Sequence, residues 1–186
     1  MSTEFSCGVI AKPVIAYDFG GTIVEPYDRR GGYFAPYGKS LETIREFVGR
    51  LGAQSNYVVT KRAKPEYEQN FYDWINTHQF LQRTGLAETN LRTCRTVAEK
   101  IPIFTELGVN ILVTNELRDL TGLDQTPVEI VLLFNAGAIS PIRRASKPWV
   151  ELIYWHDWQK VREALYTYTV RSKTKEQPTA AATASA

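Results

Sequence analysis

Short apolar runs alternate along this chain with longer segments in which apolar residues recur every three or four positions. The clearest runs lie at 14–17, 57–59, 111–113 and 130–134. Runs of this length, bounded by turn residues, are typical of strands buried on both faces, and the periodicity between them is typical of amphipathic helices. The alternation predicts an α/β fold of the three-layer Rossmann-like kind, with a mostly parallel sheet and helices on both faces.

The helical periodicity predicts four helices between and after these strands. They are expected at 40–51, 65–85, 96–107 and 157–168, and weaker apolar stretches at 91–95 and 152–154 are expected to be short strands, the second at a sheet edge. Ser40 is expected to cap the first helix and Gly52 to end it, and Pro65 is expected to open the second.

The 186 residues suit one α/β domain over 1–171, followed by a tail at 172–186. The tail has no bulky apolar residue, so it is expected to be disordered and to add nothing to the core. A composition with 44% hydrophobic and 23% charged residues excludes disorder for the chain as a whole.

Charge and cysteine content narrow the expected partners and location. The net charge of +2 gives no electrostatic reason to expect nucleic acid. No apolar stretch reaches the roughly 20 residues that span a bilayer, and the first residues do not resemble a signal peptide, so no membrane partner is expected. The two cysteines, Cys7 and Cys94, lack the spacing of metal ligands and indicate free thiols, so a cytoplasmic location is expected.

Polar residues follow three of the predicted strands, at the point where each strand ends. These residues are Asp18-Phe19-Gly20-Gly21-Thr22, Thr60-Lys61-Arg62 and Thr114-Asn115. The carboxyl ends of parallel strands meet at one edge of the sheet, where such folds bind ligands. A functional site is therefore expected at this edge.

The segment IAYDFGGTIV resembles the first motif of the haloacid dehalogenase (HAD) superfamily, an Asp-x-Asp-Gly-Thr sequence after an apolar strand. Thr60 after YVV matches the second motif, Lys100 in VAEKIPIF the third, and ILVTNELRDL the fourth, where the family carries an acidic pair. All four come in the family's order and on the expected elements. The resemblance covers roughly residues 13 to 158 and implies a HAD-like fold.

The resemblance also implies roles for these residues. In that family the first Asp is a nucleophile that accepts a phosphoryl group, and the Asp two positions later is the general acid and base. The Ser or Thr and the Lys bind the phosphoryl oxygens, and the acidic pair holds Mg²⁺. The implied catalytic residues are Asp18, Thr22, Thr60, Lys100 and Asn115. Cations and donors are required because a carboxylate nucleophile is repelled by an anionic phosphate.

Two motif positions depart from the family pattern. Gly20 stands at the acid–base position and cannot move a proton, and the uncharged Thr114-Asn115 stands at the metal-binding pair. Asp119, one helical turn further on, can supply one carboxylate besides Asp18. The expected cofactor is therefore none, or Mg²⁺ bound weakly by Asp18 and Asp119.

Three functions remain open from the sequence. The first is a hydrolase-like enzyme with a degenerate site, independent of metal or weakly dependent on it, that uses Asp18 as nucleophile or acid/base on a small or phosphorylated metabolite. Metal-free branches of the family carry Ser and Asn at the fourth motif, which Thr114 and Asn115 resemble. The second is a non-catalytic binding or partner module. The third is a Mg²⁺-dependent phosphatase that relies on Asp119.

Several residues beside the motifs are expected to contact the substrate. They are Gly20, Gly21, Tyr33, Lys61, Arg62 and Thr114. Lys61 and Arg62 lie beside Thr60 in a basic cluster that suits a phosphate or a carboxylate. Tyr33 belongs, with Tyr27, Phe34 and Tyr37, to a Gly/Pro-rich loop expected to form an aromatic flap over the site.

The spacing between motifs also bears on partners. About 40 residues separate the first motif from the second and the second from the third, which leaves no room for a cap domain. An open cleft suits a large substrate or closure by a protein partner. Trp149, Trp155 and Trp158 are candidates for an apolar contact with a second copy of the chain, as in a homo-oligomer, or for covering the edge of the sheet.

Overall fold

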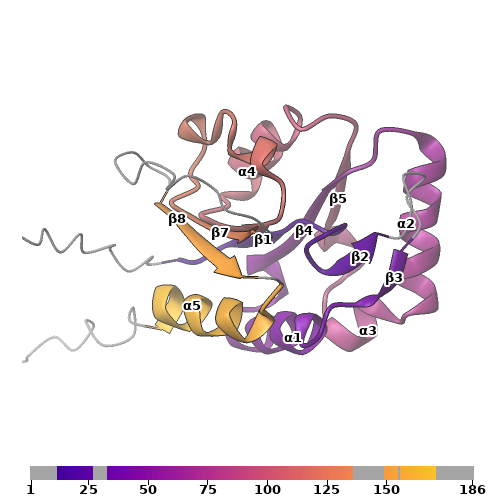
Figure 1. Cartoon of the computed structure of the whole chain (residues 1–186), viewed down its shortest axis with the longest axis horizontal. Helices are drawn as coiled ribbons and strands as arrows, with labels where there is room; N and C mark the ends of the chain where they lie inside the picture. The colour runs from indigo at the N-terminus through magenta and orange to yellow at the C-terminus, as the bar shows by residue number, and fades with distance from the viewer. Residues whose placement is uncertain (1–11, 27–32, 136–148, 155, 171–186) are drawn as a thin grey trace, which may run out of the picture.

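The computed structural model describes residues 12–26, 33–135, 149–154 and 156–170. Six parallel strands form one sheet in the order β5-β4-β1-β6-β7-β8 (Figure 1). The strands are β1 (Ile15–Tyr17), β4 (Asn56–Lys61), β5 (Leu91–Cys94), β6 (Ile111–Thr114), β7 (Ile130–Asn135) and β8 (Trp149–Tyr154). The expected parallel α/β sheet is confirmed, with the first strand inside it and the last at an edge.

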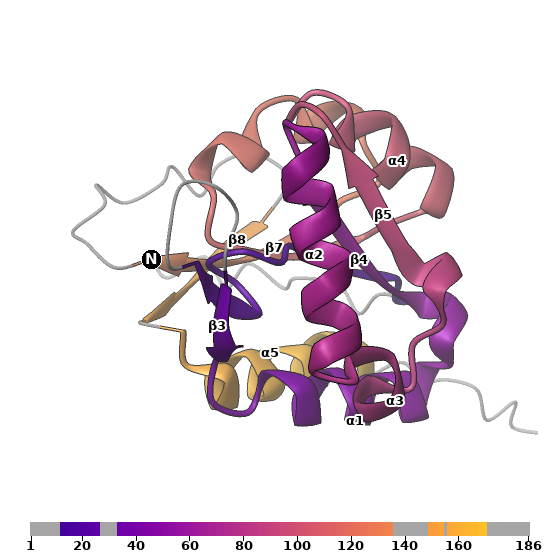
Figure 2. The same cartoon turned by 90° about the vertical axis from the view of Figure 1, so that its right-hand side faces the viewer.

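Helices lie on both sides of this sheet, so that the described residues form three layers (Figures 1 and 2). They are α1 (Ser40–Leu51), α2 (Pro65–Thr77), α3 (Phe80–Thr84), α4 (Lys100–Leu107) and α5 (Trp158–Val170). Short 3₁₀ turns occur at Ala53–Ser55, Glu88–Asn90, Leu117–Leu120 and Leu123–Gln125. No helix in these described ranges is long and apolar enough to cross a membrane.

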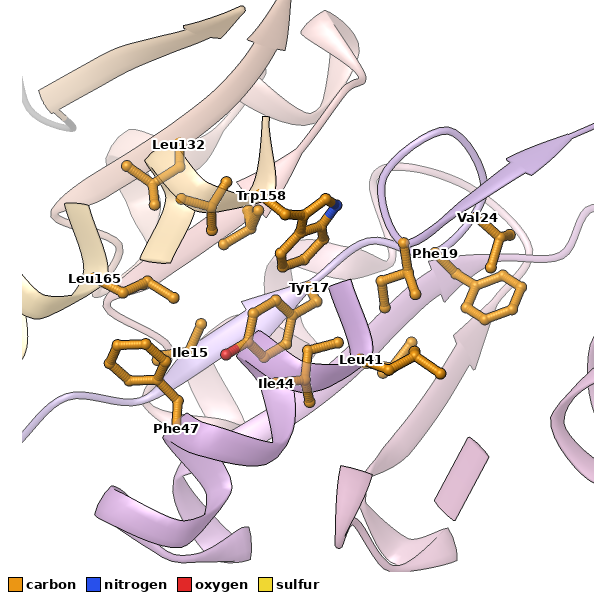
Figure 3. Close-up of a cluster of buried hydrophobic side chains, with 14 of the residues drawn as sticks. Ile15, Tyr17, Phe19, Val24, Leu41, Ile44, Phe47, Leu132, Trp158 and Leu165 are labelled. Atoms are coloured by element: carbon orange, nitrogen blue, oxygen red, sulfur yellow. The ribbon is translucent and has the colours of Figure 1, made fainter. Parts of the chain in front are cut away.

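The alternation of side chains along β1 divides the core into two clusters. Ile15 and Tyr17 belong to the larger cluster, together with Phe47 of α1 and Trp158 of α5 (Figure 3). Ala16 points to the opposite face and packs in a smaller cluster with residues of α4, β6 and β7. All three β1 side chains are fully buried. The two-sided burial explains why the sequence of this strand is uniformly apolar.

The loop after β1 forms a β-hairpin, which the sequence did not predict. Strands β2 (Val24–Pro26) and β3 (Tyr33–Pro36) pair antiparallel. The indole of Trp74 in α2 donates a 2.8 Å hydrogen bond to the carbonyl oxygen of Phe34, which ties the hairpin to the domain. Tyr37 stacks on His156, with ring centroids 4.0 Å apart. The described part of the aromatic segment is therefore attached to the domain at Phe34 and at Tyr37.

The predicted helix over 65–85 is wrong in its continuity. It is broken into α2 and α3 at His78 and Gln79, and Gln79 has a left-handed φ of 51°. The break turns the chain so that Phe80 is fully buried against the larger cluster. The burial of this ring outweighs the helical propensity of the connecting residues.

Two predicted helix starts also differ from the structure. Helix α4 begins at Lys100 instead of Thr96, because Thr96 and Glu99 form a local turn in which the Glu99 carboxylate accepts from the Arg95 N–H at 2.8 Å. Ser40 is the first residue of α1 and does not cap it. Its hydroxyl donates instead to the carbonyl oxygen of Ile23 at 3.2 Å.

Some sequence predictions fall outside the described residues or are corrected by them. The tail at 172–186, Cys7, Tyr27 and Trp155 lie outside the described ranges. Trp158 was a candidate for contact with a second copy of the chain or for covering the sheet edge, but it is buried in the core, where its indole N–H donates to the Thr22 carbonyl oxygen at 3.1 Å. It therefore cannot contribute to an intermolecular contact.

Candidate active site

A cavity of about 140 Å³ lies at the carboxyl ends of the neighbouring strands β4, β1 and β6. Its lining consists of Asp18, Gly20, Thr60, Lys61, Arg62, Val97, Lys100, Asn115, Glu116 and Asp119. The structure thus brings together candidates that lie up to 101 positions apart in the sequence (Asp18 to Asp119). Thr22, Gly21, Tyr33 and Thr114 lie behind or beside the lining and support it.

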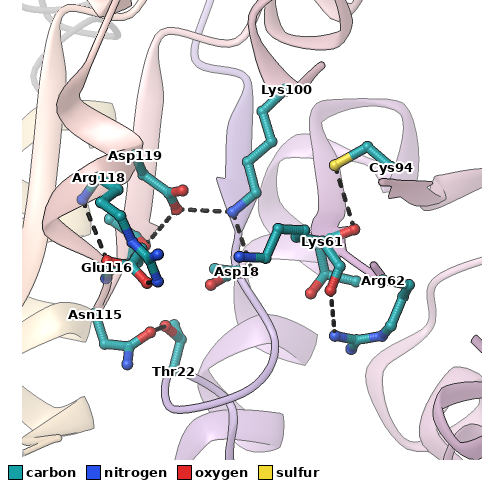
Figure 4. Close-up of polar contacts among 12 residues, drawn as sticks. Asp18, Thr22, Lys61, Arg62, Cys94, Lys100, Asn115, Glu116, Arg118 and Asp119 are labelled. Carbon is teal, nitrogen blue, oxygen red and sulfur yellow. Dashed lines mark hydrogen bonds and ion pairs between the residues drawn. The ribbon is translucent and has the colours of Figure 1, made fainter. Parts of the chain in front are cut away.

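A buried ion triad forms one wall of the cavity (Figure 4). The Lys100 ammonium lies 3.3 Å from Oδ1 of Asp18 and 2.7 Å from Oδ2 of Asp119. The Thr114 hydroxyl donates to the same Asp119 oxygen at 2.8 Å. Since Lys100 is the first residue of α4, the position of that helix sets the position of the positive charge.

Burial and charge act against each other on this triad. Burial alone lowers the pKa of Lys100, but the carboxylates of Asp18 and Asp119 outweigh it, and the pKa is raised overall. Burial, reinforced by the charge of Asp18, raises the pKa of Asp119 against the opposing effect of Lys100 and Thr114. Lys100 is therefore firmly positive at neutral pH, and Asp119 is the carboxyl group that protonates more readily than usual.

These residues do not fit a Mg²⁺ site. An ammonium group already lies between the two carboxylates, so that only one negative charge is left over to attract a cation. The amide oxygen of Asn115 accepts a 3.1 Å hydrogen bond from the Thr22 hydroxyl. Within the described ranges, no group of three or more His, Cys, Asp or Glu side chains could hold a metal ion.

The two glycines of the first motif are constrained by close neighbours. Gly21 has a left-handed φ of +80°, and a Cβ there would overlap the Asn115 amide. A Cβ on Gly20 would meet a ring carbon of Tyr33 at 3.2 Å. The aromatic ring therefore crowds the place where the family's acid–base side chain would extend, and it puts Tyr33 at the edge of the cavity.

Two further basic residues line the cavity. Lys61 is partly exposed at the end of β4, whereas Arg62 is buried and lies against three aromatic rings. The sequence pattern identified both as substrate contacts but could not show that they differ in burial. Glu116 also lines the cavity and pairs with Arg118 at 2.6 Å. Its position directly after Asn115 at a strand end was the only signal in the sequence.

Cys94 lies near the site but has no nucleophilic role in it. Its thiol donates to the carbonyl oxygen of Thr60 at 3.6 Å. Burial raises the pKa of the thiol to about 11, although Lys100 works in the opposite direction. The thiolate, which is the reactive form, is therefore scarce at neutral pH.

No family model and no curated protein sequence matches this chain. The geometry and charge of the cavity are therefore the features that bear on its function.

Proposed function

We propose that the chain is a HAD-like protein and that the cavity is a metal-independent catalytic site, in which Asp18 acts as nucleophile or acid/base on a small or phosphorylated metabolite. The observation that carries this proposal is the pairing of Asp18 with Lys100, 3.3 Å apart, at the wall of a cavity that also contains Thr60 and two further basic side chains. This arrangement supplies a carboxylate and its counter-charge without a bound ion.

The HAD-like assignment is supported by where the four motifs lie. Asp18 directly follows β1, Thr60 lies in β4, Lys100 begins α4 and Asn115 directly follows β6. Their order along the chain is that of the family, and all four line one cavity. A hairpin after β1 stands where the family places a flap.

The surroundings of Asp18 suit attack on an anionic substrate. Lys61, Arg62 and Lys100 offset the repulsion between a carboxylate nucleophile and a phosphate or carboxylate group. In such a reaction, an Asp18 oxygen forms an ester bond to carbon or an acyl-phosphate bond to phosphorus, and the leaving group departs with the bonding electron pair. Water then hydrolyses this bond, so that the product gains a hydroxyl group, one proton goes to solvent and the Asp18 carboxylate is regenerated. Because Gly20 donates no proton, the site favours leaving groups that depart unprotonated.

A second candidate function is a non-catalytic binding module. The observation that favours it is the crowding at Gly20, where an added Cβ would lie 3.2 Å from a ring carbon of Tyr33. A site that lacks its acid–base group and has that space occupied retains the means to bind an anion but loses a factor of about 10²–10⁴ in rate.

Turnover of model substrates distinguishes these functions. Purified protein is incubated with p-nitrophenyl phosphate and with 2-chloropropionate, each in EDTA and in Mg²⁺. The proposal expects turnover that EDTA does not reduce and that Asp18→Asn lowers at least ~100-fold without changing the melting temperature. Asp124→Asn, at an exposed carboxylate in a 3₁₀ turn, is the matched control and keeps full activity.

Three results contradict the metal-independent enzyme. Turnover that is abolished by EDTA and restored by Mg²⁺ points to the phosphatase. Turnover that is equal in the wild type and in Asp18→Asn rules out Asp18 as the reacting group, and the absence of turnover with both substrates favours the binding module.

A further inference from the structure

The Arg62 guanidinium is a buried cation with an unpaired hydrogen-bonding edge. The residue is only 5% exposed, and it lines the cavity that contains Asp18. The side chain folds back toward its own backbone, and its Nη1 donates a 2.8 Å hydrogen bond to the Lys61 carbonyl oxygen (Figure 4). Its Nε and Nη2 have no hydrogen-bond partner among the described residues.

The guanidinium packs mainly against aromatic rings, and the carboxylate of Asp18 acts on it only at longer range. The guanidinium carbon lies 4.6 Å from the ring centroid of Phe71 and 5.3 Å from those of Phe19 and Tyr33. No carboxylate in the described part of the chain lies within 4.0 Å of its nitrogens. Burial lowers the pKa of Arg62, with Tyr33 and Asp18 opposing the shift, but an arginine remains protonated in proteins.

A buried charge with unmet donors is costly, and proteins rarely keep one without a use for it. Nε and Nη2 share one edge of the planar guanidinium, so their N–H bonds run parallel. Two parallel donors match the two oxygens of a carboxylate or a phosphoryl group. The unpaired edge therefore has the geometry to bind two oxygens of one group.

We propose that the unpaired edge of Arg62 binds an oxyanionic group of the ligand, a carboxylate or a phosphoryl group, when the ligand enters the cavity that Arg62 and Asp18 line. This inference names the group by which the substrate of the proposed function is held. It rests on the proposed function in one respect, which is that the bound ligand is a substrate. Binding of the anion itself requires no turnover. Arg62 then holds the anionic group while Asp18 and Lys100 face the reacting atom.

The size of the cavity limits what this ligand brings into it. At about 140 Å³ it is smaller than the roughly 300–1,000 Å³ of sites that enclose a drug-sized molecule. It admits an oxyanion and the few atoms attached to it. A larger ligand extends outward past the partly exposed Lys61.

A purely structural role for Arg62 gives the opposite expectation for stability. If its stacking on the three rings held the aromatic cluster together, Arg62→Met would unfold at a lower temperature. If Arg62 is kept for a ligand, removal of an unpaired buried charge leaves the melting temperature of the ligand-free protein unchanged or higher.

The test is a titration with two probes, inorganic phosphate and malonate, read by melting temperature and by calorimetry at constant ionic strength. The wild type is expected to bind at least one of them; tighter binding of phosphate indicates a phosphoryl ligand, and tighter binding of malonate a carboxylate. Arg62→Met is expected to lose this binding. Arg62→Lys, which keeps the charge without the fork, is expected to bind at least ~10-fold more weakly. Lys64→Met, an exposed neighbour, serves as control and binds like the wild type.

The inference is overturned if the wild type binds neither probe, or if Arg62→Lys binds as tightly as the wild type while circular dichroism shows it folded. Asp18→Asn separates this inference from the proposed function. A variant that loses turnover but keeps anion binding supports both. Wild-type anion binding without turnover refutes only the catalytic proposal, and turnover without Arg62-dependent binding refutes only the inference.

Discussion

The ammonium of Lys100 lies within hydrogen-bonding or ion-pair distance of two buried carboxylates, and it is itself almost fully buried. Removal of the central cation of such a group leaves uncompensated carboxylates in a low-dielectric environment, which is more costly than the net gain from forming the group. The stability of the protein is therefore tied to the charge arrangement that the proposed function uses.

Lys100→Met is expected to lower the free energy of unfolding by about 3–5 kcal/mol, because Asp18 and Asp119 are left without their cation. Urea unfolding at pH 7 measures the change. Addition of Asp119→Asn to Lys100→Met is expected to recover part of the loss, since one of the unpaired carboxylates is then removed.

Lys160 provides the matched control, because its ion pair with Glu163 is exposed on α5. Lys160→Met should leave the urea midpoint unchanged. Equal midpoints for Lys100→Met and wild type would show that the triad does not carry the charge balance inferred from its geometry.

The sequence predicted which residues line the cavity better than it predicted how buried each of them is. Asp18, Thr60 and Asn115 each lie at or just after a strand end, and the rule that such ends meet at one sheet edge was enough to group them. Nothing in the sequence separates Lys61 from Arg62, because burial depends on the distant rings of Phe19 and Phe71. Local patterns do not report such tertiary contacts.

At the scale of elements, the break between α2 and α3 stores backbone strain at one residue. Gln79 adopts a left-handed φ of 51° with an exposed side chain. A residue with a Cβ in this region costs about 1–2 kcal/mol, whereas glycine adopts it freely at some entropic cost of its own.

Gln79→Gly is therefore expected to raise the free energy of unfolding by about 0.5–1 kcal/mol. Gln69→Gly, at an exposed position inside α2, is the matched control and is expected to lower it by about 0.5–1 kcal/mol. Both changes are read from urea midpoints. A loss of stability in Gln79→Gly would show that the helix break is not strained.

The elements that the sequence predicted well are those set by local patterns. The apolar runs became strands, and Gly52, with φ of +87°, ends α1 as expected. The misjudged boundaries share a cause, which is competition from contacts beyond the helix. Phe80 breaks a helix by entering the core, and the hairpin of β2 and β3 is stabilised by a bond from Trp74, 40 positions after Phe34.

At the scale of the whole molecule, buried groups that give up a proton only at high pH determine the alkaline stability. Burial raises the pKa of Cys94 and of Tyr17, and the carboxylates around Lys100 raise its pKa in spite of burial. In each case the folded-state pKa lies above the unfolded one. The stability contributed is then fully present below the unfolded pKa and is lost as the pH rises through the folded pKa.

The urea midpoint is accordingly expected to fall progressively as the pH rises from about 9, where the unfolded thiol begins to ionise, through about 11. In Cys94→Ala the decline between pH 9 and 11 should be shallower, whatever the variant's stability at pH 7. A midpoint that stays constant from pH 8 to 11 would contradict the buried, protonated state of these groups.

The position of β1 inside the sheet has a consequence for biosynthesis. Its two partners, β4 and β6, come later in the chain, and β6 ends at Thr114. At about 5–20 residues per second, on the order of 5–20 s separate the synthesis of β1 from that of β6. During that interval a nascent chain carries an apolar strand with an unpaired edge, and Asp18 has no counter-ion until Lys100 has emerged from the ribosome. Chaperone binding to the ribosome-bound intermediate is therefore expected to be strongest before β6 is released.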